Sequence, residues 1–237
     1  MIIRITHLAV VVILHLLLIG CSSNKYKIIE KSPTELYADA QKKLQNNNFG
    51  EAITQLEVLN NHYPFNPYSQ QVYFDLIYAY YKSANLSMTQ TLINRFMRLN
   101  PKHRNSDYIL YMRGLTNIAL DNNMLQGFFQ IDRSDRDPTY ALAAFYDFNE
   151  LLKNYPHSQY ILDSQKQLLY IANRLAKHEL AIVQYYAKNK AYVAVINRIK
   201  QMLQNYPNTQ ATRYALPIME NAYRQLQLIK QANKVTV

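Results

Sequence analysis

Four prolines, each closing a similar segment, constrain the fold of this chain more than any other feature. Pro64, Pro101, Pro156 and Pro207 end the tetrapeptides NHYP, RLNP, KNYP and QNYP. Proline cannot donate the next backbone hydrogen bond of a helix, and it disfavours the helical conformation in the residue before it. Each tetrapeptide therefore predicts a helix C-terminus, and its fourfold occurrence indicates a repeat.

Alignment on the four prolines brings mostly apolar positions into register at 15, 12, 8 and 5 residues before each proline. Spacings of three, four and three place such positions on one face of an α-helix. The four sets are Phe49, Ala52, Leu56 and Leu59; Leu86, Thr89, Ile93 and Phe96; Ala141, Ala144, Phe148 and Leu151; and Tyr192, Val195, Ile199 and Met202. An upstream segment with Tyr73, Leu76, Ile77 and Tyr80 matches the first helix of a 34-residue tetratricopeptide unit.

These repeats predict an all-α fold, a tetratricopeptide-like α-solenoid of about ten helices in five hairpins over residues 33–237. Such hairpins bury their apolar faces only by stacking, which leaves a concave binding surface. The wider spacing from Pro101 to Pro156 predicts an insertion at 121–138, and that from Pro156 to Pro207 predicts an extra helix at 160–173. We expect 209–232 to be one long terminal helix, with Pro217 kinking it or marking its first turns.

The first 20 residues have the composition of a cleaved secretory signal. Arg4 precedes an apolar run from 8 to 19, which is shorter than the roughly 20 residues of a membrane-spanning helix. The run ends in LIGC, which resembles a bacterial lipobox and implies that Cys21 becomes the lipidated first residue. The alternative is an ordinary signal with a chance cysteine. We expect residues 21–32 to be a lipidated linker and Ser22 to favour the periplasmic face of the outer membrane. Nucleic acid is not an expected partner there, despite the net charge of +10.

Few residues of the chain suggest catalysis. The four glycines are too scattered for a phosphate-binding loop or a nucleophile elbow, and one cysteine excludes an internal disulfide and a cysteine-based zinc site. His178–Glu179 lacks a second zinc ligand, because Ile182 stands at that position. The sequence therefore predicts no catalytic residue, no metal site and no cofactor.

An aromatic cluster is the candidate peptide-binding site. The chain has 21 tyrosines and no tryptophan, and Tyr63, Phe65 and Tyr68 surround two prolines near the predicted second hairpin. Exposed aromatic side chains offer large contact areas for an extended peptide at low entropic cost. Packing within the fold is an equally open interpretation of these three side chains.

Longer strings carry a resemblance to a known family. They are YPFNPYSQQ at 63–71, DLIYAYYK at 75–82, LQGFF at 125–129 leading to DRSDRDP at 132–138, and NTQATR at 208–213. The chain resembles the BamD (ComL) family, the tetratricopeptide lipoproteins of the β-barrel assembly machinery. The resemblance implies a non-enzymatic Bam-complex subunit that binds BamA and other Bam subunits and receives unfolded β-barrel proteins. It also makes the insertion at 121–138 a family feature.

Arg198 is the candidate partner-binding residue. The pattern places Val195 and Ile199 against the stack, so Arg198 lies on the flank of its helix. By geometry alone, a solvated surface arginine is the better interpretation; the resemblance implies a contact with BamA through the C-terminal repeats. A different function class, a periplasmic peptidoglycan-remodelling enzyme or regulator, also fits a basic repeat lipoprotein, but the chain lacks a catalytic constellation.

Overall fold

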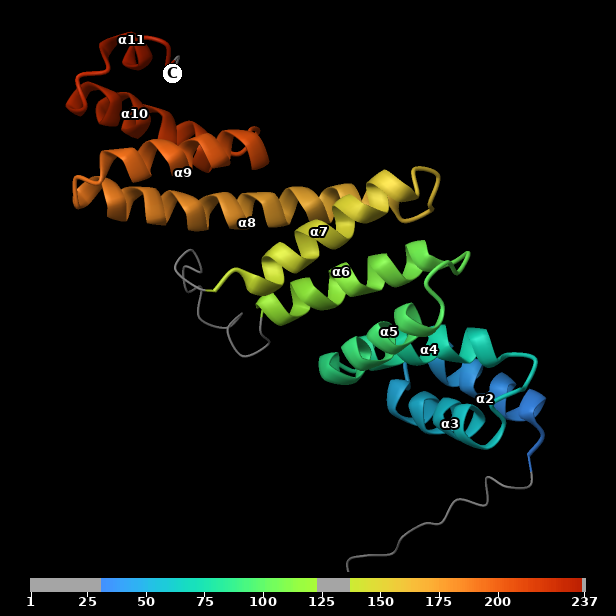
Figure 1. Ribbon diagram of the computed structural model, residues 1–237. Helices are drawn as coiled ribbons and strands as arrows, with labels where there is room; N and C mark the ends of the chain where they lie inside the picture. Colours follow the sequence, from blue (N-terminus) through green and yellow to red (C-terminus); the bar gives the residue numbers. More distant parts are fainter. Residues whose placement is uncertain (1–30, 123–136, 236–237) are drawn as a thin grey trace, which may run out of the picture.

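A computed structural model describes residues 31–122 and 137–235, and this part of the chain forms ten helices and no strand (Figure 1). The helices are α2 (Pro33–Gln45), α3 (Phe49–His62), α4 (Ser69–Lys82), α5 (Leu86–Leu99), α6 (Ser106–Asn122), α7 (Thr139–Asn154), α8 (Ile161–Lys188), α9 (Tyr192–Asn205), α10 (Gln210–Gln225) and α11 (Ile229–Ala232). The predicted signal at 1–20, Cys21 and most of the insertion at 121–138 lie outside the described residues. Within the described ranges, no helix has both the length and the apolarity of a membrane span.

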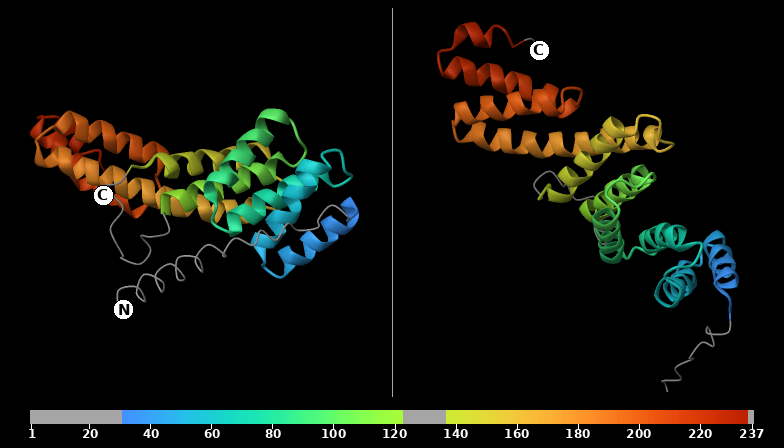
Figure 2. Two further views of the ribbon diagram at one scale, coloured as in Figure 1. Left: turned by 90° about the horizontal axis from the view of Figure 1, so that it is seen from below. Right: turned by 45° about the vertical axis from the view of Figure 1, so that its right-hand side comes forward.

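Consecutive helices pair into five antiparallel hairpins that stack in chain order (Figures 1 and 2). The pairs are α2–α3, α4–α5, α6–α7, α8–α9 and α10–α11. The prediction of an all-α, tetratricopeptide-like solenoid is therefore confirmed. The stack has two long edges. We call the edge with the start of α2 and the connections 63–68, 100–105 and 155–160 the loop edge, and the opposite edge, with the turns inside the hairpins, the turn edge.

The positions aligned on the prolines form the centre of the stack. At 12 and 8 residues before the prolines, all eight side chains are fully buried. They are Ala52, Thr89, Ala144, Val195, Leu56, Ile93, Phe148 and Ile199. The only polar member, Thr89, donates its hydroxyl to the carbonyl of Asn85 over 3.0 Å, so its burial leaves no unpaired donor.

The helix ends before the four prolines are also as predicted. Tyr63, Asn100, Tyr155 and Tyr206 follow α3, α5, α7 and α9, with φ between −130° and −135° and ψ between 46° and 62°. Each donates its backbone N–H to the carbonyl four residues earlier, which completes the last helical turn. The residue before each proline thus leaves the helical region, as the steric clash with the proline ring requires.

Four turns inside the hairpins share a left-handed residue that we did not predict. Asn47, Ala84, Lys190 and Gln227 have φ of 57°, 62°, 58° and 60°. None of them is glycine, the residue that adopts this conformation without strain. At each of these positions, a glycine would have less backbone strain than the residue present.

Two predictions about the C-terminal half are wrong. The extra helix at 160–173 is the first half of α8, which runs for 28 residues without a break. No proline or glycine occurs between Ile161 and Lys188, and buried positions continue along the helix from Ser164 to Val183. The predicted terminal helix at 209–232 is two helices, because the left-handed Gln227 ends α10 before α11 begins. Pro217 lies inside α10.

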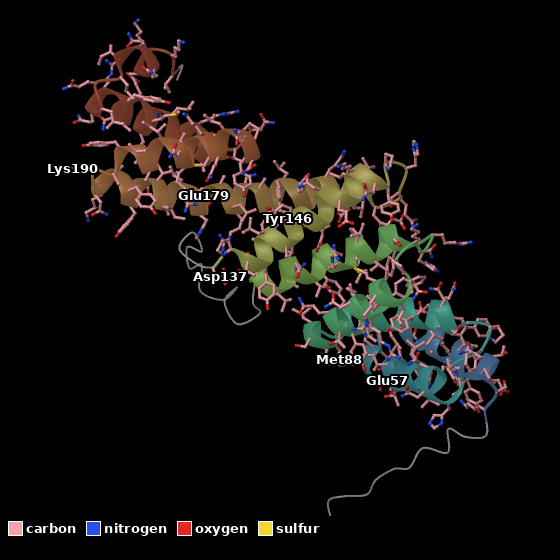
Figure 3. The ribbon with its side chains drawn as sticks, in the orientation of Figure 1. Glu57, Met88, Asp137, Tyr146, Glu179 and Lys190 are labelled. Atoms are coloured by element: carbon pink, nitrogen blue, oxygen red, sulfur yellow. The ribbon has the colours of Figure 1, made fainter. Side chains whose placement is uncertain are left out.

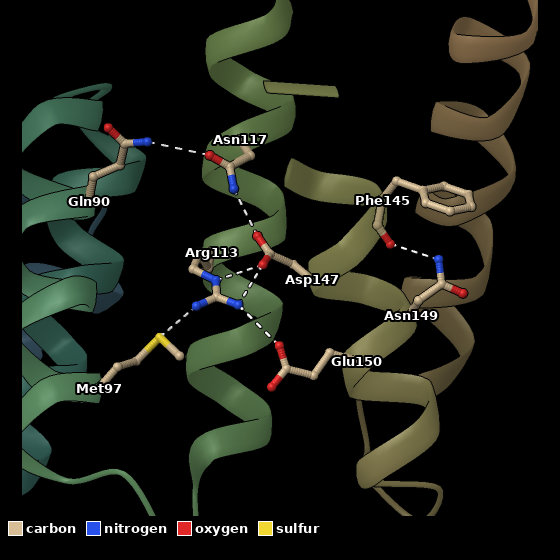
Figure 4. A network of polar contacts seen from close by, with 8 residues as sticks. All are labelled: Gln90, Met97, Arg113, Asn117, Phe145, Asp147, Asn149 and Glu150. Atoms are coloured by element: carbon tan, nitrogen blue, oxygen red, sulfur yellow. Dashed lines mark hydrogen bonds and ion pairs between the residues drawn. The ribbon is translucent and has the colours of Figure 1, made fainter. Parts of the chain in front are cut away.

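Apolar side chains form an N-terminal core in α2 to α6 and a C-terminal core in α6 to α11. Tyr111 and Leu115 of α6 pack against both cores, so α6 is the element that joins them. A polar network lies at the same junction (Figure 4). Arg113 of α6 donates from Nε to Asp147 of α7 over 2.7 Å, and Asn117 of α6 donates to the other carboxylate oxygen over 2.8 Å.

Candidate functional site

A cavity of about 440 Å³ opens between the second and third hairpins, close to the loop edge. Its walls come from one face of α4, the α5–α6 connection, the first turn of α6 and the α7–α8 connection. The lining residues are Gln71, Phe74, Asp75, Tyr78, Arg104, Asn105, Asp107, Tyr108, Gln159 and Tyr160. Aromatic faces, amides and carboxylates thus alternate around one opening, a combination that suits an extended peptide better than a small apolar ligand.

Asp75 is the most deeply buried acid of this cavity, with 9% of its surface exposed. Its carboxylate accepts hydrogen bonds from the hydroxyl of Tyr37 and from the side-chain amides of Gln41 and Gln71. Burial raises the pKa of Asp75, although these three donors act in the opposite direction. Since Tyr37 and Gln41 belong to α2, the carboxylate also ties the first hairpin to the second.

Tyrosines form the opposite wall of the cavity. Tyr108 lies between Phe74 and Tyr160, with ring centroids 5.5 and 5.8 Å away. Tyr160 stacks on Tyr111 at 4.6 Å, and the hydroxyl of Tyr111 donates to Asp163 over 2.8 Å. Burial raises the pKa of Tyr108 and of Tyr111, so both keep their protons at neutral pH. The wall is therefore a neutral, hydrogen-bonded aromatic surface.

A hydroxyl–carboxylate bond fixes the third side of the opening. Ser158, in the α7–α8 connection, donates to Asp107 in the first turn of α6 over 2.6 Å. The same serine accepts the backbone N–H of Tyr160. Arg104 remains the cationic side chain among the lining residues, and its Nε donates to Asn105 over 3.2 Å. The backbone of Tyr160 is thus held by Ser158, which Asp107 of α6 in turn fixes.

The structure separates the three predicted peptide-binding residues. Tyr68 stacks on Tyr37 with centroids 4.3 Å apart, and Tyr37 reaches Asp75, so Tyr68 lies next to the cavity. Tyr63 is half-buried against the N-terminal core. Phe65 is 98% exposed at the loop edge. Of the three residues, only Tyr68 is linked to the cavity, and the link passes through Tyr37.

Arg198 forms an ion pair within the chain. Its Nη1 lies 3.0 Å from Oε2 and 3.3 Å from Oε1 of Glu179, so α9 is linked to α8. Figure 3 shows Glu179 in the middle of α8, away from the turn at Lys190. The Arg198 side chain is still 36% exposed. It lies on the flank of α9 as predicted, with a partner that the sequence pattern did not suggest.

The residues of the cavity were not predicted as a site, although one of them had a signal in the sequence. Asp75 stands between Phe74 and Leu76 in a helix whose other buried side chains are apolar or aromatic. A carboxylate in such a position needs hydrogen-bond donors from other elements. Tyr108 and Tyr160 had no such signal, because the sequence does not show which connections face α4. Among the described residues, no group of three or more His, Cys, Asp or Glu side chains could hold a metal ion.

A family model agrees with this architecture. The model for YfiO, described as an outer membrane lipoprotein, matches residues 29–237. The match covers every helix of the fold and all lining residues of the cavity.

Several curated proteins are similar over most of their length. A Vibrio cholerae protein is 46% identical over 212 residues, which is 90% of this chain and 88% of that protein. A Pasteurella multocida protein is 44% identical, over 91% of this chain and 82% of its own length. A Haemophilus influenzae protein is 39% identical, over 92% and 83%. Each is named outer membrane protein assembly factor BamD.

Proposed function

Because this chain belongs to the YfiO family of outer membrane lipoproteins, we propose how its fold serves the function of its relatives. It is an outer-membrane lipoprotein that acts as an outer membrane protein assembly factor of the BamD type, a subunit of the Bam complex. The observation that carries this function is 46% identity over 90% of the chain. The alternative, a peptidoglycan-remodelling protein, has no support among these relatives. We propose that the role is non-enzymatic.

We propose that the cavity between the second and third hairpins receives extended segments of unfolded β-barrel proteins. Barrel strands alternate aromatic or apolar residues with polar ones. The cavity offers both kinds of contact, with Phe74 and Tyr108 for side chains and Asp75 and Gln71 for polar groups. The aromatic loop of Tyr63, Phe65 and Tyr68 forms the entrance in this proposal.

Site-specific photo-crosslinking tests this binding site. A photoreactive residue at Tyr68 or at the cavity residue Tyr78 should crosslink to unfolded barrel proteins during their assembly. The matched control is Tyr185, which is 64% exposed at the turn edge of α8. Crosslinks at Tyr63 and Phe65 would extend the site to the whole loop. Equal capture at Tyr185 and Tyr78 would show that binding does not use the cavity.

We propose that the C-terminal hairpins bind BamA through their positive charge. Residues 180–237 contain eight Lys or Arg and one acid, Glu220, so most of the chain's excess charge lies there. Such a charge imbalance suits an acidic protein surface and accelerates association. Arg198 can offer its remaining guanidinium donors to a partner carboxylate. Copurification with BamA from solubilised membranes tests this proposal, and a complex insensitive to salt would speak against it.

We propose that Cys21 carries the lipid anchor of this outer membrane lipoprotein. It is the chain's only cysteine, and it follows LIG. Several acyl chains are needed for stable membrane anchoring. Mass spectrometry of the mature N-terminus should detect an acylated Cys21. A free, unmodified amine at that residue would contradict the proposal.

A further inference from the structure

We infer that the part of the loop edge formed by the ends of α5 and α7, the α5–α6 connection and the start of α8 is a membrane-contacting surface that docks on the phospholipid headgroups of the leaflet to which the protein is anchored. The inference rests on the lipoprotein assignment, and it concerns residues that the proposed peptide site and the proposed BamA site do not use. The key residues are Arg98, Leu99, Lys102, Lys153 and Leu162.

The anchor segment enters the fold at the loop edge. The chain enters α2 at Ser32, whose side chain caps the helix, and this point belongs to the loop edge (Figure 1). Ten residues lie between Cys21 and Ser32, and the eleven Cα-to-Cα steps that join the two span at most about 40 Å. The turn edge lies a helix length further away, about 20 Å for a helix of this size. A lipid at Cys21 therefore favours the loop edge as the part of the fold nearest the bilayer.

The loop edge also carries positive charge that is not paired with acids. From Leu76 to Ser106 the chain contains five Lys or Arg and no acid. Arg98 lies in the last turn of α5, Lys102 in the connection that follows, and Lys153 in the last turn of α7. All three are exposed, and none forms an ion pair within the described ranges.

The turn edge of the same hairpins has both paired and unpaired cations. Lys43 forms an ion pair with Glu51, and Lys82 lies over the ring of Phe49, whereas Lys42 is exposed and in none of the ion pairs of the described residues. Cations in a last helical turn are also favoured by the helix dipole, so charge alone does not identify a membrane surface. The helix dipole does not explain the exposed leucines at the loop edge.

Exposed apolar side chains lie at the same edge. Leu99 is 61% exposed next to Arg98, and Leu162 is 74% exposed in the first turn of α8. Basic residues interspersed with apolar ones are typical of surfaces that bind anionic bilayers, where each cation adds roughly fivefold to the binding constant. The loop edge thus combines the tether, the charge and the apolar side chains that such a surface needs.

The absence of tryptophan in the chain allows a direct test. The full-length lipidated protein would carry Leu99→Trp and be reconstituted into vesicles of phosphatidylethanolamine and phosphatidylglycerol that contain a brominated lipid. Its fluorescence should shift to the blue and lose intensity relative to vesicles without bromine. Val193→Trp is the matched control, because Val193 is also 61% exposed but lies at the turn edge. Its fluorescence should not change.

Neutralising two cations tests whether positive charge contributes to membrane docking. In the Leu99→Trp background, Arg98→Gln with Lys102→Gln should reduce the quenching in vesicles with phosphatidylglycerol. Equal quenching of the two reporters, or none at Leu99, would overturn the inference. A blue shift at Leu99 that appears only after BamA is added would also overturn it, since the edge would then bind protein. These variants leave Tyr68 and the cavity unchanged, so crosslinking to barrel proteins reports on the proposed function separately.

Discussion

Gly114 of α6 faces the ring of Phe148 of α7 so closely that a Cβ atom on Gly114 would lie 2.6 Å from Cζ of Phe148. Phe148 is fully buried, so its ring has no space into which it could move. We expect Gly114→Ala to lower the free energy of unfolding by about 1–3 kcal/mol, as overpacking of a core does. Urea denaturation followed by circular dichroism measures this change.

Gly50 provides the control for this substitution. It lies in the first turn of α3, where a Cβ would meet no atom within 4 Å. Gly50→Ala should raise the free energy of unfolding by up to about 1 kcal/mol through helix propensity and reduced freedom of the unfolded chain. If both variants changed stability in the same direction, contact with Phe148 would not be the reason why position 114 is glycine.

The left-handed turn residues predict a stabilising substitution. Ala84 has φ of 62°, a conformation that its Cβ disfavours. Ala84→Gly should raise the free energy of unfolding by about 0.5 kcal/mol, because relief of this strain exceeds the extra entropy of glycine in the unfolded chain. The preceding Ser83 has φ of −82°, so Ser83→Gly should lower stability. Two thermal melts under identical conditions compare the variants, and a loss of stability in both would contradict the assignment of strain.

The buried pair Arg113–Asp147 predicts a pH-dependent variant. Asp147 is 4% exposed, and burial raises its pKa above 3.8, although Arg113 and Asn117 lower it. The folded state therefore holds the Asp147 proton more tightly than the unfolded state, and this contribution to stability is lost as the pH rises through the folded pKa. Arg113→Met removes the compensating cation and should cost about 3 kcal/mol at pH 7.

The loss of stability in Arg113→Met should be smaller at pH 5. Without Arg113 the pKa of Asp147 rises further, so Asp147 is more readily protonated there and less buried charge is left unpaired. The control is Glu150→Gln, since Glu150 pairs with the same arginine but is 47% exposed. Its effect should be at most about 1 kcal/mol. Denaturation curves at both pH values test the difference, and a deficit that stays constant with pH would mean that Asp147 is not its origin.

The Arg198–Glu179 pair allows the two roles of Arg198 to be separated. Arg198→Glu replaces the guanidinium that lies 3.0 Å from Glu179 with a second carboxylate, and it also places a negative charge opposite the proposed acid of BamA. It should weaken copurification with BamA by about 2–5 kcal/mol. The double variant Arg198→Glu with Glu179→Arg restores an ion pair between α8 and α9 but leaves the charge at position 198 reversed.

Copurification in the double variant is the measurement that distinguishes the roles. Persistent loss of BamA would support a direct contact of Arg198. Full recovery would show that Arg198 acts only by holding α9 against α8. Circular dichroism of both variants checks that helical content is unchanged.

The regular part of the fold follows from the sequence because a single steric rule acts four times. Each proline fixes a helix end, and counting back from it identifies buried residues such as Ala52 and Ile199. The same rule says nothing where proline is absent. The absence of proline and glycine permits the continuity of α8 but does not distinguish one long helix from two, and the break at Gln227 depends on a turn conformation that its residue type does not mark.

The cavity was less predictable for a related reason. Its walls come from four elements between Gln71 and Tyr160, and the side chains meet only after the hairpins have stacked. Tyr68 was identified because it is aromatic and lies near prolines, but its stacking partner Tyr37 is 31 residues away in the sequence. The ion pair of Arg198 with Glu179 likewise required the register between α8 and α9.

The uninterrupted helix α8 connects the aromatic wall of the cavity to the part of α8 that pairs with Arg198. A helix of 28 residues is about 42 Å long, twice the length of most of its neighbours. Its first turn holds Asp163, the acceptor for Tyr111 in the aromatic wall, whereas its second half holds Glu179, the partner of Arg198. Because helices resist bending, a small tilt imposed at the C-terminal hairpins moves the far end of α8 by a proportionate distance. A change in the tilt of α8 at the turn edge would therefore displace the stacked ring of Tyr160 at the loop edge.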